Sequence, residues 1–546
     1  MKKLTVFCVC FLLTGICHAQ IITVDDDAPA DFNNIQEAID DSNDGDIIEV
    51  RPGTYTGSGN RDIDPNGKAV TIRSIDPNDP NIVAATIIDC NGSEAEPHRG
   101  FYFHNQEDFN SVLKGLTISN GYGLEQDEPL WGPTPLPAGG AILCSSSNPE
   151  IRNCIIRNSF ATYGGGILCN ASSPTLIGCT IINNSAHSGA GMYNYENSNP
   201  TVINCTFSDN WVSLNGRGGG IVSIESNPFL SYCAFIHNQG GGAGGGMYNG
   251  GGSPILTNCE FIGNSAPVLW LTGGGGGGMY SGDGSPDLLN CIFSGNWSHV
   301  GGGMSNEAGT PSLLNCTFVG NLANCGKGII NLWEQAIPKL TNCILWDGKD
   351  GNEIFNMFGA AISITYSDVQ GGWPGPGNID ADPCFVESGY WDANGTADDA
   401  NDDFWVDGDY HLKSEGWRWV APEGNWTWDN VTSRCIDAGN PGSPLADELL
   451  VIPRDPDNLY GRNLRINMGA YGGTTEASMP PHNWAILADL TNDGKVDLDD
   501  LAGQVEDWLN SSSDQPEDLD RNGIIDMVDF ALLGKDWLKQ TTWHEP

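Results

Sequence analysis

Two acidic segments near the C-terminus of this 546-residue chain repeat one spacing of oxygen-bearing side chains. In each segment oxygen ligands stand at positions 1, 3, 5, 9 and 12, with glycine at position 6 and a main-chain carbonyl available at position 7. The residues at these positions are Asp489, Thr491, Asp493, Lys495, Asp497 and Asp500 in the first segment and Asp518, Asp520, Asn522, Ile524, Asp526 and Asp529 in the second. Because hard oxygen donors at this spacing enclose calcium, the sequence predicts two Ca²⁺ sites.

Each calcium-type loop leads into a run of residues with a helical pattern, which carries a tryptophan at Trp508 or Trp537. A duplicated loop and helix with aspartate at position 12 resembles a type I dockerin over about residues 484–540. The resemblance implies calcium-dependent tethering to a cohesin-type scaffold protein. Positions 10 and 11 carry Leu498-Asp499 and Met527-Val528 instead of the frequent Ser-Thr pair, which leaves the cohesin partner open.

A second group of candidate residues lies in the middle of the chain, where tryptophans occur in segments of variable length. They are Trp131, Trp211, Trp270 and Trp297. Exposed aromatic rings on a rigid surface are stacking platforms for sugar rings, so the sequence predicts a polysaccharide-binding face here. The alternative is that these tryptophans pack beneath their own loops. The secondary structure that carries these tryptophans determines whether they are exposed or packed.

Eight cysteines mark a repeat of short segments through the middle of the chain. They stand at intervals of 25 to 32 residues, at Cys154, Cys179, Cys205, Cys233, Cys259, Cys291, Cys316 and Cys343. Most copies contain a proline, a short β-rich run, Asn-Cys, a second asparagine and a run of glycines. This pattern predicts the coils of a parallel β-solenoid, stacked at ~4.8 Å. The expected fold class is mainly β, followed by a small α-helical calcium-binding domain.

Stacking in register places like residues on like residues. We expect a buried column of cysteines that act as small apolar side chains, because in-register neighbours have poor geometry for disulfides. Two asparagine rows are expected: the row before each cysteine should form a side-chain amide ladder at a bend, and a second row lies five residues after the cysteine. Insertions enter each coil at a single corner, in segments 121–138, 211–217, 239–243 and 265–273. A face with lengthened loops is usually the binding face of a repeat protein.

This cadence resembles the pectate-lyase-like right-handed β-helix over about residues 21–478, and it is similar to the repeats of polymorphic outer-membrane proteins. The segment 31–55 is similar to the start of such helices. Within it Ile35, Ala38 and Ile39 have helical spacing, which predicts a short amphipathic helix over the open first coil.

The same resemblance suggests a chemistry for the variable corner. Lyases of this fold use a basic residue to remove the proton α to a uronate carboxyl, often with calcium. Arg217 is then the base candidate, with His187 and His299 in the same corner of nearby coils. The alternative for Arg217 is a solvated loop arginine. Paired carboxylates typical of glycoside hydrolases are not identifiable among the 9 acidic residues between 139 and 346.

The net charge limits the possible partners, and the N-terminal segment indicates the location of the protein. The chain has 24 Lys and Arg against 69 Asp and Glu, a net charge of −45, which excludes a non-specific nucleic-acid binder. Lys2 and Lys3 precede an apolar run too short to span a bilayer, followed by small residues suited to cleavage before Gln20. A lipoprotein site at Cys17 is the alternative. No other stretch is long and apolar enough to cross a membrane.

We therefore expect five parts: a signal peptide (1–19), a β-helix with its N-terminal cap (20–347), terminal coils with an acidic closing segment (348–478), a linker (479–483) and a dockerin (484–540). The expected protein is secreted, extracellular or on the cell surface. It binds polysaccharide and uses calcium for tethering. Degradation of the polysaccharide by a lyase or glycoside hydrolase is one hypothesis. The alternative is a non-catalytic glycan-binding, adhesion or structural protein.

Overall fold

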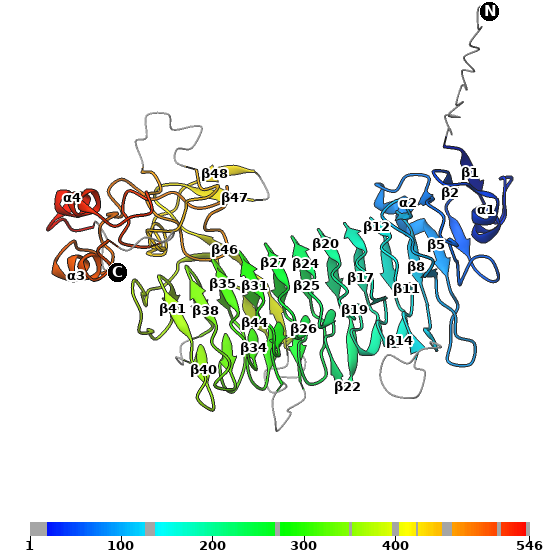
Figure 1. The fold of residues 1–546 in the computed structure, drawn as a ribbon, viewed down its shortest axis with the longest axis horizontal. Coiled ribbons are helices and arrows are strands. Elements are labelled where there is room, and N and C mark those ends of the chain that lie inside the picture. Colours follow the sequence, from blue (N-terminus) through cyan, green and yellow to red (C-terminus); the bar gives the residue numbers. More distant parts are fainter. Residues whose placement is uncertain are drawn as a thin grey trace, which may run out of the picture.

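The computed structural model describes residues 19–125, 137–267, 274–348, 352–395, 403–421, 424–449, 461–509 and 515–541. Nearly all of the predicted signal peptide lies outside these residues, as do Trp131 and Trp270. The described chain winds into a long column of parallel strands, with a capped N-terminal end and a helical module at the C-terminal end (Figure 1). The prediction of a parallel β-solenoid is confirmed.

Three parallel sheets run along the column. They are sheet A, with 13 strands from β1 (Ile21–Val24) to β41 (Ser363–Thr365), sheet B, with 12 strands from β3 (Gly53–Tyr55) to β42 (Asp368–Val369), and sheet C, with 10 strands from β6 (Phe101–Phe103) to β40 (Ile354–Asn356). A single coil supplies β19 (Met192–Tyr195) to sheet C, β20 (Thr201–Ile203) to sheet A and β21 (Thr206–Ser208) to sheet B. Each strand pairs in register with the same strand of the next coil.

The core of the column consists of identical side chains stacked along its axis. The inward residues of sheet B include Phe207, Phe235, Phe261, Phe293 and Phe318, all fully buried. The last three rings of this row lie 4.6 Å apart and within 1° of parallel. That spacing is the distance between neighbouring strands, so the backbone ladder itself sets the stacking. Burial of each ring stabilises the fold by roughly 1.5–3 kcal/mol.

The repeated cysteines form an internal column of free thiols, as predicted. All fourteen cysteines of the described chain are free, and the eight on the repeat are buried. Their Sγ atoms donate weakly to main-chain carbonyls, as from Cys233 to Val202 at 3.4 Å. Burial raises the pKa of the Cys154 thiol to about 11. Buried among apolar side chains, these cysteines serve as small core residues.

The asparagine five residues after each cysteine forms a buried amide ladder. Its members are Asn184, Asn210, Asn238, Asn264, Asn296 and Asn321. Each Nδ2 donates to Oδ1 of the next member at 2.9 to 3.1 Å, and each also donates to a main-chain carbonyl of the preceding coil. All these donors point the same way, so the last amide needs an acceptor. Asp347 supplies it, accepting from Nδ2 of Asn321 at 2.8 Å.

The sequence predicts the amide ladder for the asparagine before each cysteine, and this prediction is wrong, because that row makes a turn and bonds to other segments. Asn153, Asn204, Asn258, Asn290, Asn315 and Asn342 all have a φ of 50 to 55°. Asparagine tolerates this left-handed region better than most residues, so the row makes the sharp turn between sheets A and B. Its hydrogen bonds go largely to other segments: Asn290 donates to the carbonyls of Ala470 and Gly472, both at 2.6 Å.

The insertions collect at one corner, as predicted, and part of that corner is itself a sheet. Sheet D contains β9 (Leu124–Glu125), β10 (Pro137–Ala138), β14 (Phe160–Tyr163), β18 (Ser185–Ser188) and β22 (Trp211–Arg217). The pairing of β18 with β22 contains an irregularity between Ala186 and Ser188. The extra residues of β22 therefore lie outside its pairing with β18, and the rest of the coil keeps its register.

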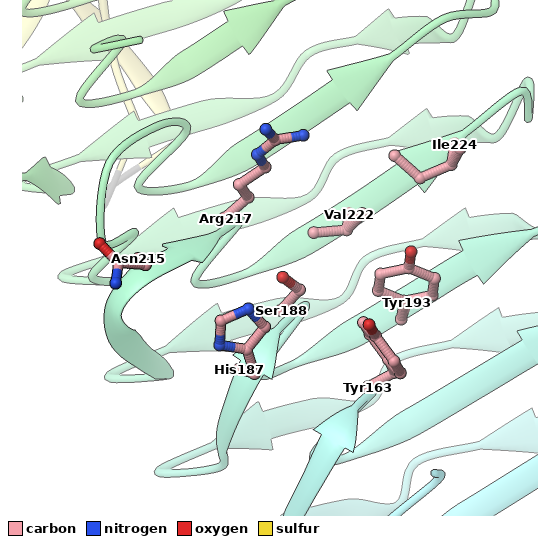
Figure 2. Close-up of a pocket in the computed structure, with 8 residues that line it drawn as sticks. All are labelled: Tyr163, His187, Ser188, Tyr193, Asn215, Arg217, Val222 and Ile224. Atoms are coloured by element: carbon pink, nitrogen blue, oxygen red, sulfur yellow. The ribbon is translucent and has the colours of Figure 1, made fainter. Parts of the chain in front are cut away.

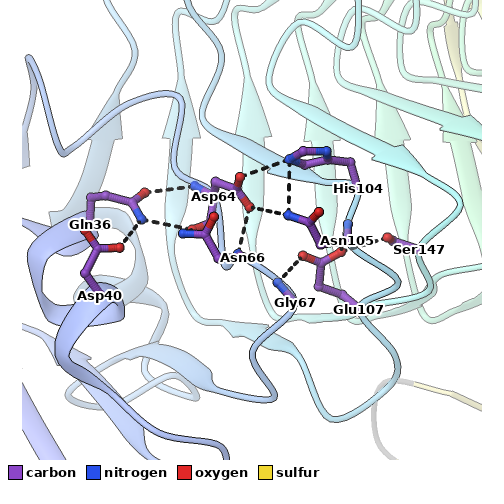
Figure 3. Close-up of polar contacts among 9 residues, drawn as sticks. All are labelled: Gln36, Asp40, Asp64, Asn66, Gly67, His104, Asn105, Glu107 and Ser147. Atoms are coloured by element: carbon purple, nitrogen blue, oxygen red, sulfur yellow. Dashed lines mark hydrogen bonds and ion pairs between the residues drawn. The ribbon is translucent and has the colours of Figure 1, made fainter.

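The N-terminal end is closed by α1 (Ile35–Asp41), the predicted cap helix, with Ile35, Ala38 and Ile39 buried. A polar network joins this cap to the first coils (Figure 3). The buried carboxylate of Glu107 accepts from the main-chain nitrogen of Gly67 at 2.9 Å and from Oγ of Ser147 at 2.7 Å. From α1, Nε2 of Gln36 donates to the main-chain carbonyl of Asp64 at 3.0 Å, and Oε1 of Gln36 accepts from the nitrogen of Asp64 at 2.9 Å. The cap is thus fixed by packing and by hydrogen bonds to this network.

The chain after sheet B does not add further coils. It folds back along the outside of the column as the closing segment, residues 379–479, with the antiparallel pairs β43 (Phe385–Glu387) with β46 (Asp409–Leu412) and β47 (Arg418–Val420) with β48 (Asn425–Thr427). The sequence also favours 409–412, 435–439 and 466–471 as last strands of the column. The first of these is β46. The other two are turns and irregular structure, joined to each other by main-chain hydrogen bonds from Gly439 to Ile466 and from Met468 to Cys435.

Replacing Asn264 by alanine tests the amide ladder. The change leaves two donors of Asn238 without their acceptor in the core and removes one of the two donors to Oδ1 of Asn296. We expect a loss of stability on the order of 2–4 kcal/mol, measured as a lower denaturation midpoint. The control is Asn215→Ala, because Asn215 is exposed on the surface. An equal midpoint for the two variants would contradict the ladder's role.

Candidate functional site

Sheet D and the outer face of sheet C meet in a concave corner, which we call the groove. It is a cavity of about 290 Å³ lined by Tyr163, His187, Ser188, Tyr193, Asn215, Arg217, Val222 and Ile224 (Figure 2). Strands β14, β18 and β22 form one wall, while β19 and β23 (Ile221–Ile224) form the other. Residues from four successive coils therefore converge on one site.

A row of outward side chains forms the floor of this corner. In register along sheet C it contains Tyr102, Leu143, Leu168, Tyr193, Val222, Tyr248 and Tyr280. Most of these side chains are buried although they face away from the core, because side chains of the variable corner cover them. Sequence reasoning missed the tyrosines. Their signal is the residue after methionine in Met192-Tyr193, Met247-Tyr248 and Met279-Tyr280.

Arg217 lies over the tyrosine row. Its Nη1 donates to the phenolic oxygen of Tyr248 at 2.9 Å, and its guanidinium carbon lies 5.0 Å from the centre of that ring. Tyr248 stacks on Tyr280 at 5.0 Å, and Tyr280 donates to Glu307. Burial raises the pKa of Tyr248, and the charge of Arg217 partly opposes this. The arrangement presents a fixed cation at the edge of the groove.

The other site residues predicted from the sequence lie at different distances from the groove. His187 lines the groove with Arg217, and its Nδ1 lies 2.9 Å from Oγ of Ser213. His299 lies beside Trp297, three coils or ~14 Å beyond Arg217 along the column and four coils beyond His187. Trp211 and Trp297 share one row of the corner, also three coils apart. Trp211 is 51% exposed, which agrees with a surface platform, but it does not line the groove.

A second cavity lies on another side of the column, between the asparagine turns and the closing segment. It has a volume of about 370 Å³, and its lining includes Tyr232, Glu260, Tyr471 and Glu476. Atoms of the cavity wall displace water from Glu260 and, with Asp407, raise the pKa of its carboxyl. These two glutamates were missed because nearly 220 residues separate them in sequence.

A buried histidine supports the second cavity from behind. Nδ1 of His411 lies 2.6 Å from Oδ1 of Asp409, and Nε2 lies 3.2 Å from Oε2 of Glu476. The imidazole also stacks on Tyr471 at 3.7 Å. Burial acts to lower the pKa of His411, but the hydrogen bonds to Asp409 and Glu476 outweigh it and raise the pKa. The imidazole of His411 thus bridges the carboxylates of Asp409 and Glu476.

Hydrogen bonds from main-chain nitrogens to aspartate carboxylates hold the shape of the calcium-type loops. In the second loop Asp518 accepts from the main-chain nitrogens of Asn522 at 3.1 Å and Gly523 at 2.6 Å. Asp529 accepts from those of Asp520 at 3.1 Å and Asp526 at 2.8 Å. Carboxylate oxygens of Asp518, Asp520 and Asp529 lie within 4.8 Å of one another. A hard oxygen donor set of this kind fits Ca²⁺.

The first loop repeats this arrangement. Asp489 accepts from the nitrogens of Asp493 and Gly494, and Asp500 accepts from those of Thr491 and Asp497. Each loop ends in a capping box that starts a helix, α3 (Leu498–Glu506) or α4 (Met527–Asp536). Burial raises the pKa of Asp489 to about 7. A cation would offset the cost of holding such a carboxylate ionised.

The two halves of the module are related by an internal symmetry. Val496, at position 8 of the first loop, exchanges hydrogen bonds with the chain after α4, at Leu538 and Lys539. Ile525, at position 8 of the second loop, accepts from Leu509, just after α3. Each loop therefore pairs with the end of the other half, and the duplication seen in sequence is one folded unit.

The chain is similar to a family described as a right-handed β-helix region, whose model matches residues 83–276 and 139–322. Together with the sheet topology, this match identifies the fold as a right-handed parallel β-helix. No curated protein matches the chain. Among the described residues, no helix is both long and apolar enough to cross a bilayer.

Solved structures similar to the chain are distant from it in sequence. Pectate lyase Pel9A has 13% identity, with 84% of this chain and 97% of that chain covered at a TM-score of 0.41. A rhamnogalacturonan lyase has 13% identity, with 72% and 97% covered at 0.33. Tailspike protein 3 of bacteriophage CBA120 has 13% identity, with 75% and 68% covered at 0.30. At these values no activity is transferred to this chain.

The environment of His411 predicts a pH dependence of stability. Its pKa is raised on folding, so its contribution is complete below the ordinary histidine pKa near ~6.5 and is lost as pH rises through the folded pKa. We expect His411→Gln to lower the melting temperature more at acidic than at alkaline pH. The control is His187→Gln, which replaces a histidine that is exposed on the surface. A pH-independent effect of His411→Gln would contradict the prediction.

Proposed function

We propose that this protein is secreted and binds polysaccharide in the groove, while calcium-loaded loops at its C-terminal end provide attachment to a partner. The observation that carries the proposal is the groove itself: a rigid concave corner in which aromatic, hydroxyl and basic side chains from four coils converge. The N-terminal signal peptide predicted from the sequence supports secretion.

The chemistry of the groove suits a sugar chain. Tyr163 and Tyr193, with ring centres 5.2 Å apart, offer aromatic surface against which the apolar face of a sugar ring can pack. Ser188, Asn215 and His187 add polar groups that can bind sugar hydroxyls. The repeats contain 9 acidic and 5 basic residues between 139 and 346, so stacking and hydrogen bonding dominate over charge. Arg217 adds one cation for a carboxylate-bearing sugar.

Binding in the groove also costs little conformational entropy, because the solenoid holds the site in place. Strands on both sides hold the main chain of each coil that contributes to the groove. Side chains such as Tyr248 and Arg217 are fixed by each other. A site that is already ordered loses little freedom when a ligand binds.

We assign the groove to binding rather than to proton abstraction. A guanidinium cannot be deprotonated in a protein, and Arg217 donates to Tyr248 as a charged group. A second candidate function, glycoside hydrolysis, belongs to the other cavity. There the pKa of Glu260 is raised by the surrounding atoms and by Asp407, while Glu476 pairs with His411. Two carboxyl groups in unlike environments are the pattern of an acid and a base.

The helical module supports the proposal of an attachment partner. Leu498 and Met527, at position 10 of the two loops, are 69% and 64% exposed. Exposed apolar side chains at equivalent places of a symmetric unit suit a protein partner. We propose a cohesin-type scaffold protein as that partner and Ca²⁺ as the ion of both loops.

Glycan binding tests the groove. The wild type should be retarded in affinity gels that contain at least one of polygalacturonan, xylan, arabinan or β-glucan. Arg217→Gln and Tyr163→Ala should each weaken that retardation, by about tenfold in affinity for a loss of ~1.4 kcal/mol. Matched controls are Arg152→Gln, on sheet A, and Trp333→Ala, on the turn opposite sheet D. Retardation that is unchanged in the groove variants would place binding elsewhere.

Turnover assays on the same glycans test the second candidate. Hydrolysis in the second cavity predicts new reducing ends without an unsaturated product, and Glu260→Gln should abolish them. An unsaturated product that depends on Arg217 would contradict our assignment of the groove to binding. Loss of reducing ends in Arg217→Gln, with Glu260→Gln fully active, would contradict the assignment of the second cavity.

Calcium titration tests the loops. Calorimetry of the wild type should show two sites, and Asp489→Ala or Asp518→Ala should remove one site each, because position 1 supplies a carboxylate that no neighbour replaces. The control Asp499→Ala changes an exposed aspartate outside the ligand positions and should retain both. Two sites in the double variant Asp489→Ala/Asp518→Ala would contradict the assignment.

A further inference from the structure

Position 4 of each calcium-type loop binds the closing segment of the solenoid. In the first loop this residue is Asn492, which is 3% exposed. Its Nδ2 donates to the carbonyls of Gly377 at 2.8 Å and Ala438 at 2.7 Å. Neither of these acceptors belongs to the module. The first loop is therefore attached to the column by a side chain that is not one of its predicted ligands.

The second loop makes the equivalent contact. Its position 4 is Arg521, whose Nε donates to the carbonyl of Pro441 at 3.1 Å and whose Nη2 donates to that of Leu464 at 3.0 Å. Asn492 and Arg521 have the same left-handed backbone, with φ of 59 and 56°. The internal symmetry of the module thus places two corresponding side chains on one target, the closing segment.

A buried arginine of the closing segment completes the joint. Arg465 has no exposed surface beyond 1%, and its Nη1 donates to the main-chain carbonyl of Asp489 at 2.7 Å. Its Nε and Nη2 both donate to the carbonyl of Gly439, at 2.9 and 2.7 Å. Asp489 is position 1 of the first loop. One guanidinium therefore links the first predicted calcium ligand to the turn at 438–440.

That turn is bound in its own right to the column. The nitrogen of Asn440 donates to Oδ1 of Asn342 at 2.7 Å, and Asn342 is the last of the asparagines that turn the chain from sheet A to sheet B. Trp484, from the start of the module, donates through Nε1 to the carbonyl of Ile436 at 3.1 Å and shares an apolar core with that segment. A continuous set of contacts connects the loops to the last coil.

The segment predicted as a linker belongs to the same joint. Met479 is 1% exposed and exchanges main-chain hydrogen bonds with Trp417, at 2.7 and 3.3 Å. Its carbonyl also accepts from Oγ of Ser414 at 2.5 Å. A flexible tether would leave these groups to solvent. The structure instead connects the column and module through a segment whose first residues, Met479 and Pro480, are buried.

We propose that calcium loading of the loops and closure of the solenoid's C-terminal end are coupled, so that the module acts as a calcium-dependent clamp on the column. The inference rests on the proposed function, in that it takes calcium as the ion of the loops. Position 4 lies between ligand positions 3 and 5, so a bound ion fixes its backbone. Without the ion, the clustered carboxylates repel one another and loosen the loop.

Loosening of the loops has a defined cost in the closing segment. Withdrawal of Asn492 and Arg521 leaves the carbonyls of Gly377, Ala438, Pro441 and Leu464 without these donors. Some of these groups are buried, and buried polar groups without partners are destabilising. By linkage, closure of the segment in turn strengthens calcium binding by the same factor.

Hydrogen exchange of the full-length protein tests the coupling. Peptides that cover 435–441 and 464–468 should exchange about tenfold more slowly in about 1 mM calcium than in chelator. In the double variant Asn492→Ala/Arg521→Ala this calcium dependence should disappear, while calorimetry still detects calcium binding at reduced affinity. The control is Lys495→Ala, since Lys495 is exposed at position 7 and offers only its main-chain carbonyl. It should retain the calcium dependence.

The outcomes separate the inference from the proposed function. Calcium binding by the wild type without a change of exchange in these peptides would overturn the coupling alone. Calcium-dependent exchange that persists in the double variant would also overturn it, because the joint would then lie elsewhere. Failure of the wild type to bind calcium in calorimetry would overturn the calcium part of the proposed function and the coupling with it.

Discussion

The rest of this structure depends on the in-register pairing of each coil with the next. Every strand obtains its main-chain hydrogen bonds from the coils above and below it, so a coil that changed the length of a sheet strand would leave buried polar groups without partners. Identical side chains therefore fall on one another. The phenylalanine stack at 4.6 Å and the amide ladder from Asn184 to Asn321 are consequences of that constraint. Only the corner outside the three long sheets can lengthen.

The same constraint creates a problem at each end, because the first and last coils lack a neighbour. At the N-terminal end α1 covers the open coil. At the other end the amide ladder finishes in the carboxyl of Asp347, which lies beside Glu353. Burial and the neighbouring Asp347 raise the pKa of Glu353 to about 10, so this pair holds a proton and avoids two buried charges. The closing segment and the helical module then cover the outside.

Sequence reasoning succeeded where a property recurs with the coil and failed where contacts are made once. The cysteine column and the single corner of insertions follow from spacing alone, but spacing did not show which of the two asparagine rows forms the amide ladder. The tyrosine row was missed because successive residues after the glycine run face opposite sides of sheet C. Only Met192-Tyr193 and its two counterparts indicate which residue faces outward. Glu260 with Glu476, and Asn492 with Ala438, are single long-range contacts without a repeat to announce them.

Because the joint between the column and the module is ordered, attachment through the module would also fix the orientation of the groove. A flexible linker lets a binding surface sample many orientations relative to its anchor. Here Arg465, Asn492 and Arg521 fix the module against the last coil, and the main-chain ladder fixes every coil against its neighbour. The groove, several coils away, therefore keeps a constant direction relative to the exposed apolar residues Leu498 and Met527. A glycan held in the groove and a partner held by the module would be oriented by one continuous set of hydrogen bonds.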